Sequence, residues 1–227
     1  MMLEKYLGHR IFVYLLLVAF FILYPLGALA GHVVVIDPAH GGTDTGVTAS
    51  KITEKDLTLA IALELKKALD KQAGIDVVLT RDTDKTLSIQ ERQKKILEAK
   101  PALVLSLHIN AGFGKNSSGF ELYYPGFTFD SAGDTKSKKG SAAAGKKHLN
   151  DTVKLARIVQ RSLDNLFVRK GRGLREAPVP LAEGLSVPVL VVELGFVTNA
   201  DDKKKLVSPK VQKDIAGALA AAIKSFF

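Results

Sequence analysis

The sequence predicts an α/β fold, a three-layer sandwich in which one largely parallel sheet carries helices on both faces. Short β-branched runs alternate along the chain with segments of helical apolar periodicity, which is typical of parallel sheets with crossover helices. The predicted strands are apolar throughout, as expected for strands covered on both sides. With 227 residues, 47% of them hydrophobic, and no internal repeat, the chain fits one domain with accessory segments.

The first half of the chain shows the alternation clearly. Residues 33–37 form a β-branched run that stops at a proline, which predicts a buried strand. The segment 53–71 repeats leucine and isoleucine at helical spacing, with Thr53 as its predicted N-cap. A second strand is predicted at 75–81, and the sequence SIQE at 88–91 is a capping box that opens the next helix.

The second half continues the pattern after an interruption. The interruption follows two predicted strands and precedes the next predicted helix. Each of these elements is again predicted from the spacing of its apolar residues. The predicted elements are a strand at 102–110, a strand at 119–124, a helix with apolar residues from Leu155 to Leu166, a strand around 189–193, and a last helix that opens at Ser208 and Pro209.

The interruption, at about residues 125–150, is rich in glycine, serine, alanine and lysine and has no sustained period. This composition predicts a flexible basic loop inside the domain. Its position and charge favour contact with an anionic polymer. The lysines are Lys136, Lys138, Lys139, Lys146 and Lys147.

Residues 1–30 have the composition of an export signal. Lys5 and Arg10 precede a long apolar run, and residues 28–30 read Ala-Leu-Ala, the pattern of a cleavage site. The apolar run also approaches the length that can span a bilayer, so an uncleaved anchor is the alternative, and only then would the membrane be a partner. In either case residues 31–227 are expected outside the cytoplasm, in the periplasm or the cell wall.

The formal charge of +9 favours an anionic partner. An exported protein rarely meets nucleic acid, so we expect cell-wall polymers or lipid headgroups and no nucleic acid. The chain contains no cysteine, which excludes disulfides and thiolate metal sites. Any metal must therefore be held by histidine, aspartate or glutamate.

Ionisable residues stand where three apolar strands end. His40 follows the first strand, His108 lies near the end of the third, and Glu193 interrupts the last. Glu54 stands in the first turn of a helix. In a parallel sheet these strand ends meet at one edge, where sites of α/β proteins form. Two histidines and one carboxylate are a common ligand set for catalytic zinc, which would leave the second carboxylate as a base.

These motifs resemble those of the zinc-dependent N-acetylmuramoyl-L-alanine amidases, the family often called amidase type 3. The resemblance covers nearly all of residues 33–227 in the expected order. It is carried by the segments VIDPAHGGTDTG, ITEKDLTLAIALELKKAL, VVLTRDTD, SIQER, SLHINA, GRGLREA and VPVLVVELGFVTNADD.

The resemblance implies that His40, Glu54 and His108 ligate one Zn²⁺ per chain and that Glu193 is the catalytic carboxylate. It implies hydrolysis of the peptidoglycan amide between N-acetylmuramic acid and L-alanine. Asp37 is a further candidate, as a hydrogen-bond partner of a ligand histidine. Asn110 and Arg81 are candidate contacts to the substrate or to a ligand.

Two alternatives stay open at this point. Another cell-wall zinc peptidase, acting within the stem peptide, would share the same metal site and differ only in its product. A non-catalytic wall-binding protein of the same fold would differ by losing a ligand or the catalytic glutamate, and all four residues are present in this chain.

Overall fold

The computed structural model describes residues 31–112, 116–125, 138–167 and 173–227. The predicted export signal at residues 1–30 lies outside them. No helix in the part of the chain that is described is both long and apolar enough to cross a membrane. The elements are β1 (His32–Pro38), β2 (Thr48–Ala49), β3 (Ile52–Thr53), α2 (Glu54–Leu69), β4 (Ile75–Leu79), α3 (Ile89–Ala99), β5 (Leu103–Asn110), β6 (Glu121–Pro125), α4 (Lys138–Leu163), β7 (Leu174–Ala177), the 3₁₀ turn η1 (Pro180–Ala182), β8 (Val189–Phe196), α5 (Ala200–Leu206) and α6 (Pro209–Phe226).

The main sheet confirms the predicted fold class. Its six strands have the order β4-β1-β5-β8-β6-β7. The four strands β4, β1, β5 and β8 run parallel, whereas β6 is antiparallel to β8 and parallel to β7. The carboxyl ends of β1, β5 and β8 therefore lie side by side at one edge, and the amino end of β6 joins them there.

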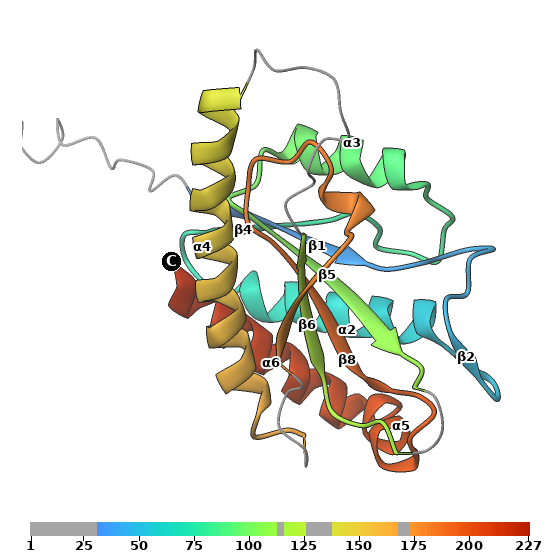
Figure 1. Ribbon diagram of the computed structural model, residues 1–227. Coiled ribbons are helices and arrows are strands. Elements are labelled where there is room, and N and C mark those ends of the chain that lie inside the picture. Colours follow the sequence, from blue (N-terminus) through green and yellow to red (C-terminus); the bar gives the residue numbers. More distant parts are fainter. Residues whose placement is uncertain (1–30, 113–115, 126–137, 168–172) are drawn as a thin grey trace, which may run out of the picture. The chain divides into compact units, whose positions relative to one another are not determined.

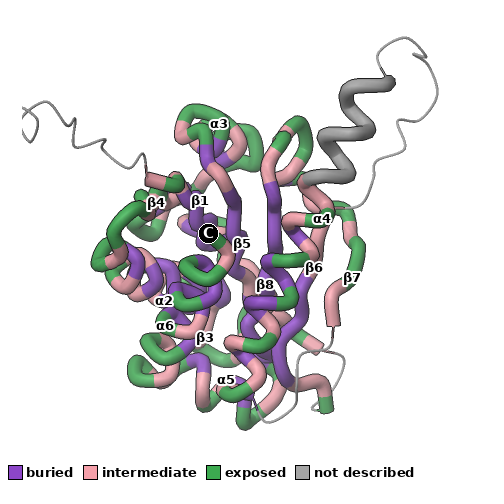
Figure 2. Tube along the Cα trace, turned by 90° about the vertical axis from the view of Figure 1, so that its left-hand side faces the viewer, coloured by how far each residue is buried: buried purple, intermediate pink, exposed green. Residues whose placement is uncertain are grey.

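Helices cover both faces of this sheet (Figure 1). The larger core lies on the face of α2, α4 and α6 and includes Ile36 and Leu105 from the strands. The smaller core lies on the face of α3 and η1 and includes Val35 and Val104, the neighbours of those residues along each strand. Both faces are apolar because successive strand residues point to opposite sides. Buried positions follow β5 and β8 through the centre (Figure 2).

The helix starts follow the sequence signals with different local chemistry. Ser88 and Glu91 form the predicted capping box at the start of α3, each side chain bonding the other residue's backbone N–H. Thr53 precedes α2 as predicted, but its hydroxyl donates to the Asp56 carboxylate and caps no backbone group. The strand β7 and the helix α5 lie where no apolar period predicts an element.

The predicted basic loop is wrong over its second half. Helix α4 begins at Lys138, although the sequence predicts irregular structure to about residue 150. Alanine and lysine have high intrinsic helix propensity, so such a segment forms a helix without an apolar period. Residues 126–137, the first part of the predicted loop, lie outside the described residues.

Candidate metal centre

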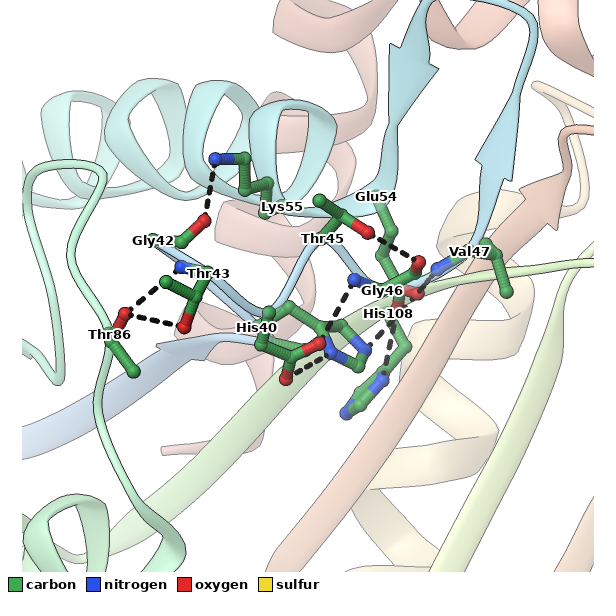
Figure 3. Close-up of polar contacts among 12 residues, drawn as sticks. His40, Gly42, Thr43, Thr45, Gly46, Val47, Glu54, Lys55, Thr86 and His108 are labelled. Atoms are coloured by element: carbon green, nitrogen blue, oxygen red, sulfur yellow. Dashed lines mark hydrogen bonds and ion pairs between the residues drawn. The ribbon is translucent and has the colours of Figure 1, made fainter.

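Three side chains from three separate elements meet at the carboxyl edge of the sheet. His40 follows β1, Glu54 is the first residue of α2, and His108 lies in β5. One nitrogen or oxygen from each lies within 4.8 Å of the others (Figure 3). The topology places them together because β1 and β5 are neighbouring parallel strands and α2 begins directly beneath the loop that follows β1.

His40 is held in a fixed orientation by Asp44. The Nδ1 atom of His40 lies 2.8 Å from Asp44 Oδ2, and its Nε2 atom lies 3.1 Å from Glu54 Oε2. The Gly46 N–H donates a hydrogen bond to Asp44 Oδ1 and so fixes this carboxylate in turn. A carboxylate on one ring nitrogen fixes the tautomer and leaves the other nitrogen available as a ligand. In this arrangement Nε2 is the His40 atom that could bind a metal.

Glu54 is a buried carboxylate with four hydrogen-bonding neighbours. Its Oε2 accepts from the Val47 N–H, and its Oε1 accepts from the Ile109 N–H. His108 Nδ1 also lies 3.1 Å from Oε1. Burial disfavours the charge, but the hydrogen bonds from His108, His40 and the two amides outweigh it and lower the pKa of Glu54 to about 2. The carboxylate is therefore ionised at neutral pH.

The same contacts raise the pKa of His40. Its hydrogen bond to Glu54 is the main cause, opposed by burial, and the pKa of His40 rises to about 9. Without a metal, protonated His40 therefore balances the charge of Glu54, and a divalent cation would have to displace that proton in order to bind.

Glu193 stands beside this cluster on the next strand. It pairs with His108 across the β5–β8 ladder, so the two side chains share one face of the sheet. Among the described residues, its buried Oε2 atom has no hydrogen-bond partner. Burial raises the pKa of Glu193 to about 7, and the nearby Glu54 and Glu121 charges act in the same direction. A carboxyl group with this pKa can take up and release protons near neutral pH.

Two buried arginines hold the loop that carries His40. Arg92 donates to the carbonyl oxygens of Pro38 and His40 and pairs with the buried Asp37 carboxylate. Arg81 donates to the carbonyl oxygens of Pro38 and Ala39. The loop needs this support because His40 has a φ of 62°, which is uncommon for a residue with a side chain. Guanidinium groups supply several donors in a rigid plane and so fix several carbonyls at once.

The donor set fits a zinc ion. Ligand atoms that lie about 2.0–2.2 Å from a tetrahedral zinc ion are about 3.4 Å from one another. His40 Nε2 lies 3.1 Å from Glu54 Oε2, and His108 Nδ1 lies 3.1 Å from Glu54 Oε1. Taken as one atom from each residue, the three lie within 4.8 Å of one another, so zinc binding would draw them slightly closer. Two imidazoles and a carboxylate are a common ligand set of catalytic zinc sites, in which three protein ligands leave the fourth coordination position for water.

Comparison with known proteins agrees with this geometry. The family model described as N-acetylmuramoyl-L-alanine amidase matches residues 34–225. The chain belongs to this amidase family. YqiI, an uncharacterized protein of Bacillus subtilis, is 30% identical over 199 residues, which cover 88% of this chain and 86% of YqiI. The germination-specific N-acetylmuramoyl-L-alanine amidase of B. subtilis is 27% identical, over 88% of this chain and 81% of its own.

A solved structure extends the likeness to the fold. The catalytic domain of CwlV, an N-acetylmuramoyl-L-alanine amidase from Bacillus (Paenibacillus) polymyxa, superposes with a TM-score of 0.68. It is 26% identical, and the likeness covers 86% of this chain and 97% of that domain. The chain is thus an amidase of the peptidoglycan-hydrolysing type, with the three-layer fold of that family.

The structure places the other predicted site residues of this amidase in supporting positions. Asp37 bonds Thr80, Ser106 and Arg92 and not a histidine, so the predicted partnership is wrong. Asp44 takes that role instead. It lies four residues after His40 in the glycine-rich loop, and that spacing was the available signal.

Arg81 and Asn110 support the amidase site in different ways. Arg81 is fully buried against backbone carbonyls, so it shapes the loop and does not reach the surface. Asn110 donates to the carboxylate of Glu121, a buried residue of β6 that the sequence does not single out. The ladder partner of Glu121 across β6 and β8 is Glu193.

A substitution at Gly46 tests whether this geometry determines metal affinity. A Cβ at Gly46 would lie 2.5 Å from Glu54 Oε2 and 2.6 Å from His40 Cδ2, so Gly46→Ala must displace both side chains. We expect zinc affinity to fall by at least about tenfold, the scale seen when groups that orient metal ligands are disturbed. Competition with a chromophoric chelator measures it.

Gly74→Ala is the matched control for this substitution. Gly74 also has a positive φ, of 81°, but a Cβ there would meet no atom within 4 Å. Both variants carry the backbone strain of a side chain in the left-handed region, and only Gly46→Ala crowds the cluster. Equal zinc affinity in the two variants would show that the crowding at Gly46 is relieved without moving the ligands.

The raised pKa of Glu193 predicts a pH-dependent cost in stability. A carboxyl group whose folded pKa lies above its unfolded value of 4.5 loses stability on ionising. The cost is absent well below pH 4.5, grows up to pH 7 and is full above it. At pH 8 we expect Glu193→Gln to raise the free energy of unfolding of the metal-free protein by about 1–3 kcal/mol.

Urea denaturation at pH 4 and pH 8 checks this expectation. The gain should almost disappear at pH 4, where the wild-type carboxyl group is mostly protonated in both states. Glu98→Gln, on an exposed face of α3, is the control and should change neither value. A gain of the same size at both pH values would assign the effect to packing and not to ionisation.

Proposed function

We propose that this chain is a zinc-dependent amidase that hydrolyses the bond between the lactyl group of N-acetylmuramic acid and the L-alanine of the stem peptide. One Zn²⁺ per chain is held by His40, Glu54 and His108, and Glu193 is the catalytic carboxylate. The observation that carries the proposal is the cluster of three ligand atoms within 4.8 Å beside a buried carboxylate oxygen without a hydrogen-bond partner.

The chemistry follows from the roles of the two carboxylates. When bound, zinc polarises the amide carbonyl and lowers the pKa of water to about 7. Glu193 accepts the proton of the attacking water and returns it to the amide nitrogen, which leaves as the amine of L-alanine. Glu54 would stay ionised throughout, because a carboxylate ligand of a divalent cation is deprotonated, and its pKa is already low without the metal. One carboxylate therefore holds charge while the other moves a proton.

Product analysis distinguishes this function from its alternatives. Purified residues 31–227 are incubated with peptidoglycan and zinc, and the products are identified by mass spectrometry. The amidase releases intact stem peptides with a free L-alanine amine and leaves unsubstituted glycan. Cleavage within the stem would indicate a zinc peptidase, and binding without any product would indicate a wall-binding protein.

We also propose that residues 1–30 direct export and that the protein acts in the periplasm or the cell wall. The basic start, the apolar run and the Ala-Leu-Ala sequence at 28–30 support export. The lysines between Lys136 and Lys147 would add a contact to anionic wall polymer. The sequence charge supports this contact, which is separate from the chemistry at Glu193.

Paired substitutions separate the roles of the two carboxylates. Glu193→Gln keeps the shape of the side chain but cannot accept a proton, so it should bind zinc almost normally and lose about 10²–10⁴-fold in turnover. Glu54→Gln removes the charged ligand, so it should weaken zinc binding and lose activity for that reason. Zinc titration followed by turnover on purified peptidoglycan measures both effects.

Excess zinc provides the internal control for this pair. It should partly restore Glu54→Gln and leave Glu193→Gln inactive, because the latter already holds its metal. Loss of zinc from Glu193→Gln with retention in Glu54→Gln would mean that the two roles are reversed. Full turnover in both variants would remove both residues from the reaction.

Neutralising the lysines tests the contact with anionic polymer. Replacing the five lysines from Lys136 to Lys147 by glutamine should reduce sedimentation with cell-wall sacs at low salt. Attraction between exposed charges is screened within about 8 Å at physiological ionic strength, so the wild type should also detach as salt is added. Cleavage of a small soluble muropeptide should not change. Faster cleavage by the variant would show instead that this segment restrains the site.

A further inference from the structure

A row of polar side chains continues from Glu193 across the next two strands. Glu193 is paired with Glu121 in the β8–β6 ladder, and Tyr123 is paired with Arg175 in the β6–β7 ladder. Ladder partners lie on the same face of a sheet, and so do residues two apart on one strand. Glu193, Glu121, Tyr123 and Arg175 therefore share the face that also carries His108.

Glu121 is the buried centre of this row. Its Oε2 accepts from Asn110 Nδ2 and from the Tyr123 hydroxyl, each at 2.9 Å. Its Oε1 lies 3.5 Å from Arg175 Nη1. The side chain of Glu121 is only 5% exposed, whereas that of Arg175 is 48% exposed. A buried carboxylate thus lies against a half-exposed guanidinium, which has five N–H donors in all.

Among the described residues, three other cations close to the candidate metal site are engaged by protein groups. Arg81 and Arg92 are buried against backbone carbonyls. Lys55 bonds the Gly42 carbonyl and the Asp84 carboxylate. Arg175 differs because it is half-exposed and lies on the same sheet face as Glu193. It is therefore placed to meet an anionic group of a molecule bound at the metal cluster.

The spacing suits the second residue of a stem peptide. Strands lie about 4.8 Å apart, so β7 is about 10 Å from β8. Arg175 stands level with Val191, two residues before Glu193, and its side chain reaches back toward Glu121, the ladder partner of Glu193. An extended peptide advances about 3.5 Å per residue, which puts the second residue about 7 Å from the scissile amide. In peptidoglycan that residue is a glutamate linked through its side chain, which leaves its α-carboxylate free.

We propose that Arg175, held by Glu121, is a substrate subsite that binds the free carboxylate of the second stem residue. The planar guanidinium presents paired N–H groups that match a carboxylate. The subsite rests on the proposed amidase function, because it is defined by its distance from the amide that Glu193 helps to cleave. It makes the enzyme selective for stems in which this carboxylate is not amidated.

The test compares two soluble muramoyl peptides that differ at one group. The second residue carries a free α-carboxylate in one peptide and a carboxamide in the other. Arg175→Gln should lose about ten- to a hundredfold in kcat/KM on the carboxylate peptide, mainly through KM, which is the range for a hydrogen bond to a charged group. It should change little on the carboxamide peptide. Zinc content should equal that of the wild type.

Arg161→Gln is the matched control, since Arg161 is an exposed arginine on α4, the helix that packs on the opposite face of the sheet. It should match the wild type on both peptides. Equal losses by Arg175→Gln on both peptides would overturn the subsite and assign Arg175 to the support of Glu121. No loss on either peptide would also overturn it. A zinc-loaded wild type that cleaves neither peptide would instead overturn the proposed function on which the subsite rests.

Discussion

The carboxylate of Glu54 is the contact on which the site depends. It joins the loop after β1, the start of α2 and the end of β5, through His40, its own backbone and the Ile109 N–H. A buried charge of this kind is tolerated only when its oxygens are fully hydrogen-bonded, and here two histidines and two amides provide the donors. The same four contacts that offset the cost of burying Glu54 also bring the candidate ligand atoms of His40, Glu54 and His108 together.

That contact in turn requires an unusual backbone at His40. The left-handed conformation there and the close approach of Gly46 to Glu54 are held by groups outside the cluster. Arg81 and Arg92 donate to consecutive carbonyls of the loop, and the charge of Arg92 is compensated by Asp37. Buried ion pairs add little net stability but strongly restrict geometry. In this protein the restriction is useful, because the loop carries His40, a candidate metal ligand.

The alternation of strand and helix patterns predicts the fold class. The strand-end argument then predicts the meeting of His40, Glu54 and His108, because parallel strands end at one edge whatever their packing. It could not predict Arg92, Glu121 or Arg175. These act through contacts between residues 52 to 55 positions apart in the chain, or through a short strand with no apolar period. The start of α4 was missed for a related reason, since helix propensity without periodicity resembles a loop.

The site contains two carboxylates whose surroundings move their pKa values in opposite directions. Donors from every side keep Glu54 ionised, while burial without a partner for Oε2 raises the pKa of Glu193 to about 7. Such separation assigns one group to hold charge and the other to transfer protons. Glu121, on the neighbouring strand β6, also affects the pKa of Glu193. Asn110 and Tyr123 donate to Glu121 and Arg175 lies beside it, and Glu121 is one of the neighbours that raise the pKa of Glu193. Arg175 contacts this buried carboxylate and is itself half-exposed, so the group that holds the guanidinium in place is distinct from the group that it is proposed to bind.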